Sequence, residues 1–138
     1  MQITTSTETG TVPVTVMHVQ GSIDSITYED FTARANELIE NGVRNILMDF
    51  SQTPFISSAG LRALHGILRK LQTLQSGSKT SEVIINKKVG IGGYKSPHLK
   101  LLNLSRENQI AFELSGFNMF IETYTDREKA IASFQGLT

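Results

Sequence analysis

Residues 44 to 61 read Arg44-Asn45-Ile46-Leu47-Met48-Asp49-Phe50-Ser51-Gln52-Thr53-Pro54-Phe55-Ile56-Ser57-Ser58-Ala59-Gly60-Leu61. The apolar run at its start leaves neither side of a strand for water, which predicts a strand over about 43 to 50 buried on both faces, as at the centre of an α/β sheet. Pro54 marks a turn, and two serines then precede a helix. Ser57 or Ser58 is a good N-cap, because a serine oxygen can accept a hydrogen bond from a first-turn amide.

The opening of this helix is also a place where an anion is favoured. The first amides of a helix have no intrahelical acceptor, and the helix dipole adds partial positive charge there. A phosphate added to either serine would therefore be held at the helix start, or would disrupt the surface of a bound partner. A simple N-cap is the alternative interpretation of the same serines.

Working outward, strand-like and helix-like patterns alternate along the chain. Alternating β-branched residues predict a strand over about 12 to 20, and apolar residues three and four apart predict helices on both sides of the 43 to 50 strand. The first ten residues are either a frayed start or a short edge strand from Gln2. The predicted helices are 28–41, 61–74, 107–114 and 126–134, and the remaining strands are 99–103 and 119–124. Alternation of this kind predicts an α/β sheet.

Four short motifs stand in an order that resembles the STAS family, and within it the single-domain bacterial anti-sigma-factor antagonists. They are Gly21-Ser22-Ile23-Asp24, Asp49-Phe50-Ser51, Phe55-Ile56-Ser57-Ser58-Ala59-Gly60-Leu61, and the run 99–105 followed by 112–117. The resemblance implies one STAS-like domain over residues 1–138. Its fold would be a mixed sheet of four or five strands with helices packed mainly on one face, and its atypical part is a loop excursion at about 75–98.

The same resemblance implies a function and a set of site residues. The protein would be a phosphorylation-controlled switch that sequesters an anti-sigma serine kinase, with a separate serine phosphatase to restore it. The residue aligned with the family's phosphoacceptor is Ser58, and Ser57 is the alternative. Since the kinase brings ATP, this chain would need no cofactor. The implied partner-binding residues are Asp24, Asp49, Ser57, Ser58, Gly60, Leu61 and Arg62.

Composition narrows the function classes. Thirteen basic residues balance 13 acidic ones, whereas a nucleic-acid-binding domain normally carries excess Lys and Arg on one face. With no cysteine, disulfides and thiolate metal sites are excluded, and the three histidines have no ligand spacing that predicts a metal site. No signal segment or membrane-spanning apolar run is visible, so we expect a cytoplasmic protein with no membrane association.

Catalytic motifs are missing from the sequence as well. No Gly-x-Ser-x-Gly elbow surrounds the paired serines, and the Gly77-Ser78-Lys79-Thr80 run lacks the upstream glycine of a phosphate-binding loop. We therefore expect a protein that is not an enzyme. Two other functions stay open: a constitutive STAS scaffold or transporter-associated module, and a small-ligand-binding STAS domain with the 75–98 excursion as a lid.

Overall fold

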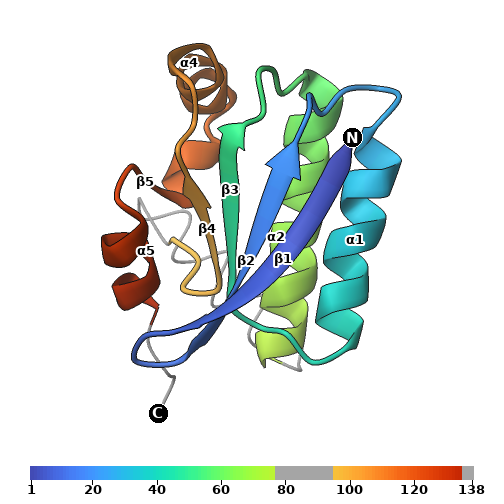
Figure 1. The fold of residues 1–138 in the computed structure, drawn as a ribbon. Coiled ribbons are helices and arrows are strands. Elements are labelled where there is room, and N and C mark those ends of the chain that lie inside the picture. Colours follow the sequence, from blue (N-terminus) through green and yellow to red (C-terminus); the bar gives the residue numbers. More distant parts are fainter. Residues whose placement is uncertain (77–94, 135–138) are drawn as a thin grey trace.

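The computed structural model describes residues 1–76 and 95–134, and there it forms a five-stranded mixed sheet with helices against it (Figure 1). The strand order is β1-β2-β3-β4-β5; β1 pairs antiparallel with β2, and the other neighbours are parallel. The strands are β1 (Gln2–Thr9), β2 (Pro13–Gln20), β3 (Ile46–Gln52), β4 (Leu99–Leu102) and β5 (Glu122–Tyr124). The helices are α1 (Tyr28–Glu40), α2 (Ser58–Ser76), α4 (Arg106–Ser115), the 3-10 turn η1 (Phe117–Met119) and α5 (Arg127–Ser133).

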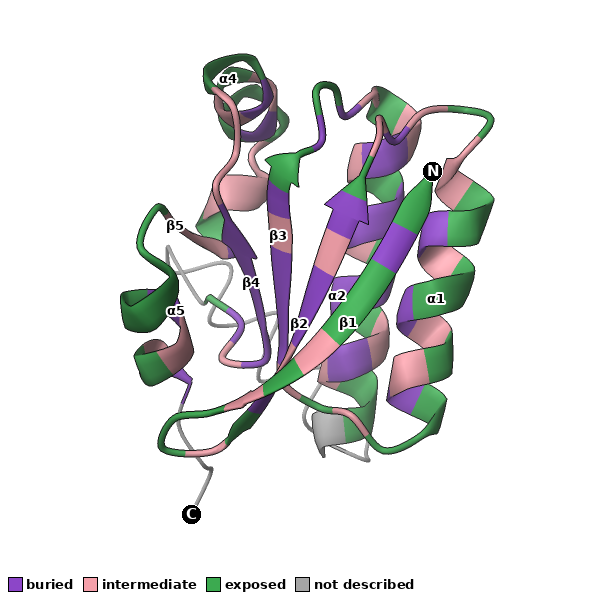
Figure 2. Ribbon diagram, in the orientation of Figure 1, coloured by how far each residue is buried: buried purple, intermediate pink, exposed green. Residues whose placement is uncertain are grey.

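This architecture confirms the predicted α/β fold and the central position of the strand predicted over 43 to 50. β3 lies in the middle of the sheet, and Ile46, Leu47 and Met48 are fully buried (Figure 2). The start of the chain is an eight-residue edge strand rather than a frayed end. The last predicted strand is shorter, because residues 117–119 form the 3-10 turn that precedes β5. Most of the predicted excursion at about 75–98 lies outside the described residues.

One face of the sheet is covered by α1 and α2, which lie side by side behind it in Figure 1. Their buried side chains pack on alternate residues of the strands, in a single large apolar cluster that includes Phe31, Leu64, Met17, Met48 and Leu101. Because side chains alternate between the two faces of a strand, the neighbours of these strand residues point to the other side.

The other face is covered only in part. Among the described residues α5 packs there, in a smaller apolar cluster with Val16, Leu47 and Phe134. The Lys100 side chain anchors this contact: its Nζ donates to the carbonyl and the hydroxyl of Ser133 at 3.1 and 2.8 Å. The helices are thus mainly on one face, as predicted.

Beyond α5, the strands β1, β2 and β3 carry polar side chains on this second face. We call this region the open half-face; its residues are Thr4, Ser6, His18, Gln20, Asp49 and Ser51. Their side chains are exposed or partly buried, whereas the strand residues beneath α5 are buried.

Candidate functional site

The paired serines lie where β3 passes into α2, at the edge of the sheet formed by the carboxyl ends of the parallel strands (Figure 1). Ser57 caps the helix. Its Oγ accepts a hydrogen bond from the Gly60 amide at 3.3 Å, and its carbonyl accepts the first helical bond, from Leu61, at 2.9 Å. This is the arrangement of an N-cap serine.

Ser58 is the first residue of α2, and its side chain is exposed. Because Ser57 supplies the cap, the hydroxyl of Ser58 is not required for that role. The two serines therefore differ in environment: Ser57 is half-buried and bonded to the helix, and Ser58 faces solvent at the positive end of the helix dipole.

Asp24 organises the turn between β2 and α1. Its Oδ1 accepts hydrogen bonds from the amides of Ile26 and Thr27 at 2.9 and 3.0 Å, and these bonds lower the pKa of its carboxyl. The turn lies next to the serine loop, because Ile23 pairs with Ile56 in an isolated parallel bridge. Asp24 is thus near the serines, with its carboxylate already engaged by the backbone.

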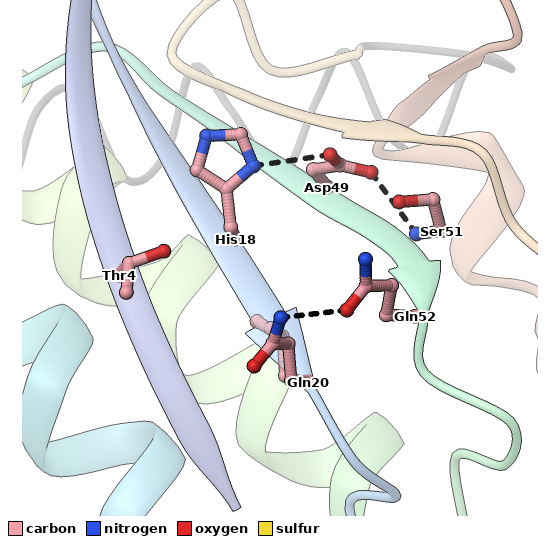
Figure 3. Close-up of a pocket in the computed structure, with 7 residues that line it drawn as sticks. Thr4, His18, Gln20, Asp49, Ser51 and Gln52 are labelled. Carbon is pink, nitrogen blue, oxygen red and sulfur yellow. Dashed lines mark hydrogen bonds and ion pairs between the residues drawn. The ribbon is translucent and has the colours of Figure 1, made fainter.

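Asp49 is separated from the other predicted partner-binding residues. It lies within β3, on the face of Leu47, opposite to α2. Its Oδ2 is 3.1 Å from Nδ1 of His18 (Figure 3). The Nε2 of the same imidazole is 3.2 Å from the hydroxyl of Ser6. The structure therefore does not bring Asp49 together with Asp24 and the serines.

The ionised form of Asp49 is favoured by its partners. Burial by itself would raise the pKa of this carboxyl, but the amide of Ser51, which donates to Oδ1 at 3.0 Å, and the side chain of His18 outweigh burial and lower the pKa. A carboxylate on the open half-face is thus negatively charged at neutral pH.

A small cavity of about 150 Å³ adjoins this pair. Next to it, Gln20 donates from Nε2 to Oε1 of Gln52 at 2.6 Å (Figure 3). The lining residues are Thr4, His18, Val19, Gln20, Asp49, Ser51 and Gln52. Apart from one valine they are polar, so the cavity offers both hydrogen-bond donors and acceptors.

Gly60 is buried, and its small size serves packing inside the protein. A β-carbon at this position would come within 2.8 Å of Cγ2 of Ile56 and 3.0 Å of the carbonyl oxygen of Ile23. The first turn of α2 can therefore approach the Ile23–Ile56 bridge only where no side chain intervenes. The glycine of the Ser57-Ser58-Ala59-Gly60 motif therefore has a structural reason inside the protein.

The last two residues of the predicted partner surface lie on the first turns of α2. Leu61 is partly buried against the large apolar cluster, and Arg62 is exposed. Arg62 also borders a depression of about 450 Å³ between α1 and α2. The other lining residues are Ser25, Tyr28, Thr32, Ala59, Ala63 and Gly66. This depression adjoins the exposed serine.

Two exposed apolar side chains were missed by the sequence analysis. Ile26 is 84% exposed in the turn after β2, and Phe55 is 54% exposed in the loop before α2. Both loops meet at the Ile23–Ile56 bridge, so these side chains lie at the same edge as Ser58. Large apolar residues inside turn-rich segments were the signal available in the sequence, because such segments are normally polar.

Asn108 was missed as well. It is buried in α4 and forms hydrogen bonds with the backbone of the serine loop. The signal in the sequence was a polar residue on an apolar helix face, since Asn108 and the buried Phe112 are four residues apart.

Metal-binding clusters and membrane-spanning helices are both absent from the part of the chain that the structure describes. Among residues 1–76 and 95–134, no three His, Cys, Asp or Glu side chains are grouped so that they could hold a metal ion. Within the same described residues, every helix is too short or too polar to cross a membrane.

Comparison with known proteins agrees with the fold. The model of the STAS domain family matches residues 3–78. A curated protein of Bordetella bronchiseptica, BtrV, is named as a candidate anti-sigma factor antagonist. It is 26% identical to this chain over 117 residues, which cover 85% of this chain and 83% of BtrV.

Solved structures of similar fold include two anti-sigma factor antagonists. Unphosphorylated SpoIIAA superimposes with a TM-score of 0.61 at 20% identity, covering 99% of this chain and all of that one. An antagonist from Mycobacterium paratuberculosis gives a TM-score of 0.68 at 19% identity, covering 96% of this chain and 94% of that one. At these identities the likeness concerns the fold.

Proposed function

Because this chain belongs to the STAS domain family, we propose that it is an anti-sigma-factor antagonist controlled by phosphorylation of Ser58. In the unphosphorylated form it binds and sequesters an anti-sigma factor that is a serine kinase. Phosphorylated, it releases that partner, and a serine phosphatase restores binding. The protein itself performs no catalysis and acts in the cytoplasm, where kinase and ATP are present.

The observation that carries this proposal is the difference between the two serines. Ser57 is occupied as the helix cap, and Ser58 presents its hydroxyl to solvent one residue later. A kinase has to reach the hydroxyl oxygen without unfolding its substrate, which Ser58 permits. The Oγ of Ser57 is half-buried and already accepts the Gly60 amide, so we assign the phosphate to Ser58.

The surroundings of Ser58 support a protein partner. Ile26 and Phe55 expose apolar area at the same edge, and exposed aromatic side chains are frequent anchors of protein interfaces. Arg62 and the depression between α1 and α2 continue this surface along the helix. A partner that covers this edge buries the Ser58 hydroxyl.

A phosphate would act on binding and leave folding nearly unchanged. It brings about −1.5 to −2 charges, which repel a complementary surface and resist burial. At the helix start, however, the free amides and the dipole stabilise an anion by about 0.3 to 1 kcal/mol. The fold therefore tolerates the modification that breaks the complex.

The test uses candidate anti-sigma kinases with ATP, followed by mapping of the phosphate. We expect Ser58→Ala to bind the kinase and resist phosphorylation, and Ser58→Asp to lose binding at an unchanged melting temperature. Thr9→Asp is a matched control, because Thr9 is an exposed hydroxyl residue at the opposite edge of the sheet. Phosphorylation of Ser58→Ala at the wild-type rate would move the site to Ser57 or elsewhere.

A second candidate function, binding of a small polar ligand, is favoured by the cavity on the open half-face. Its volume suits only a small molecule, and its ionised carboxylate with neighbouring amides and hydroxyls suits a hydroxylated amine. Ethanolamine is a direct probe, because its ammonium and hydroxyl groups match this lining. Saturable shifts of the His18 and Ser51 amide resonances, lost in Asp49→Asn, would support binding; no shift at millimolar probe would exclude this class.

A further inference from the structure

The Asn108 side chain is 2% exposed and lies between α4 and the loop that carries the serines. Its Oδ1 accepts a hydrogen bond from the Ile56 amide at 3.0 Å, and its Nδ2 donates to the carbonyl of Thr53 at 3.0 Å. The orientation of the side-chain amide follows from these partners, because a backbone N–H needs an acceptor and a carbonyl needs a donor. One side chain thus satisfies two main-chain groups of the loop.

The loop is held on its other side by the segment between β2 and α1. The amide of Ile23 donates to the carbonyl of Phe55 at 2.9 Å, and the amide of Ser57 donates to the carbonyl of Ile23 at 2.8 Å. The bonds to Ile23 and the bonds to Asn108 alternate along the loop. The backbone from Thr53 to Ser57 is therefore clamped between two segments that are distant in sequence.

This clamp has a consequence for Phe55, which lies between the two residues that Asn108 bonds. An aromatic side chain left 54% exposed gains free energy by turning toward apolar surface, so a free loop would rearrange to cover it. With Thr53 and Ile56 fixed, the backbone on either side of Phe55 cannot make that movement. Phe55 is held outward at the edge where Ser58 begins its helix.

We propose that Asn108 is a positioning residue for the switch: it fixes the loop so that Phe55 and Ser58 are presented together to the kinase. The part of this inference that concerns the kinase rests on the proposed function. The part that concerns the loop does not, because it is a statement about the protein alone.

The loss of Asn108 should affect the loop differently if the residue only stabilises the fold than if it positions the loop. If Asn108 served only stability, its loss would lower the free energy of unfolding and leave the loop of the folded protein unchanged. If it positions the loop, its loss opens the loop locally while the sheet stays closed. Amide hydrogen exchange separates these cases, since it reports the opening of each segment.

The experiment compares Asn108→Ala, Asn108→Asp and the wild type, at a temperature where each is folded. We expect the exchange of the Ser57 amide, whose acceptor is the Ile23 carbonyl and is not removed by the substitution, to rise by about tenfold or more in Asn108→Ala relative to that of Met48 in β3. Asn108→Asp keeps an acceptor for Ile56 and loses the donor to Thr53, so its rise should be smaller. The matched control is Phe112→Leu, a buried change on the same helix.

Kinase assays on the same variants supply the second measurement. We expect kcat/KM for Ser58 phosphorylation to fall by about tenfold in Asn108→Ala and to stay near wild type in Phe112→Leu. An unchanged ratio of Ser57 to Met48 exchange would overturn the inference. A looser loop with kcat/KM equal to that of Phe112→Leu would overturn it too. If no kinase modifies the wild type, the proposed function fails, and the exchange ratio still decides whether Asn108 fixes the loop.

Discussion

The two faces of the sheet differ in what covers them and in what their side chains do. On the face of α1 and α2, alternate strand residues are apolar and buried in one cluster. On the other face, the short helix α5 covers only part of the sheet. The rest of that face, the open half-face, carries a hydrogen-bonded row of three side chains, one from each of three strands: Ser6, His18 and Asp49. The first face holds the fold together. The second leaves polar groups available to solvent or a ligand, and the serine site lies at the edge between them.

The largest effect on stability is expected on the covered face. Leu64→Ala removes a fully buried side chain of α2 and leaves a cavity, which should lower the free energy of unfolding by about 2 to 5 kcal/mol. Thr4→Ala on the open half-face should change it by less than about 0.5 kcal/mol. Urea denaturation of both variants measures the contrast, and similar losses would mean that the two faces contribute alike.

Gly60→Ala should come next, because the added methyl group would overlap Ile56 and the Ile23 carbonyl. We expect a loss of about 1 to 3 kcal/mol, as for other overpacked sites. Gly66→Ala on the same helix is the control. A β-carbon there meets nothing within 4 Å, so the higher helix propensity of alanine should stabilise the protein by about 0.4 to 1 kcal/mol. If the denaturation midpoints of Gly60→Ala and Gly66→Ala shifted equally, the proposed overlap at Gly60 would be contradicted.

Asp49→Asn should have a smaller effect, about 1 kcal/mol at pH 7, because it weakens the charge-assisted bond to His18. The pKa of Asp49 is lowered from its ordinary value of 3.8 in the folded state. Its contribution is therefore present above that value and is lost as the pH falls through the folded-state pKa. The difference in unfolding free energy between wild type and Asp49→Asn should shrink as the pH falls below about 4. A difference that persists at pH 2 would show that charge is not its source.

The smallest effect on stability is expected at Ser58, at the end of the sheet where α2 begins. Ser58→Asp places a carboxylate in the first turn of α2, where the dipole offsets any lost solvation, so the free energy of unfolding should change by less than about 0.5 kcal/mol. Ser57→Ala, which removes the cap, should lose about 1 kcal/mol. Thermal unfolding of the two variants side by side tests whether the serines have the separate roles that the structure gives them. Equal losses would contradict that separation.

Local sequence was enough to predict the elements. The unbroken apolar run at 46–48 identified the central strand, since only burial on both faces accommodates it, and helical spacing in residues 61–71 identified the helix after it. The serine pair before this helix marked its start. These are properties of residues within one or two turns of each other, which is why the fold class was readable without the structure.

The tertiary structure decided what each candidate residue contacts. The order of the motifs, through the family resemblance, grouped Asp49 with the serines as partner-binding residues, but its position within β3 turns it to the opposite face, toward His18. The order also gave no sign that Gly60 packs on Ile23, or that Asn108 bonds the loop from more than 50 residues away. Such contacts depend on strand register and on how elements distant in sequence approach each other. The pattern of residues along the chain contains no information about either.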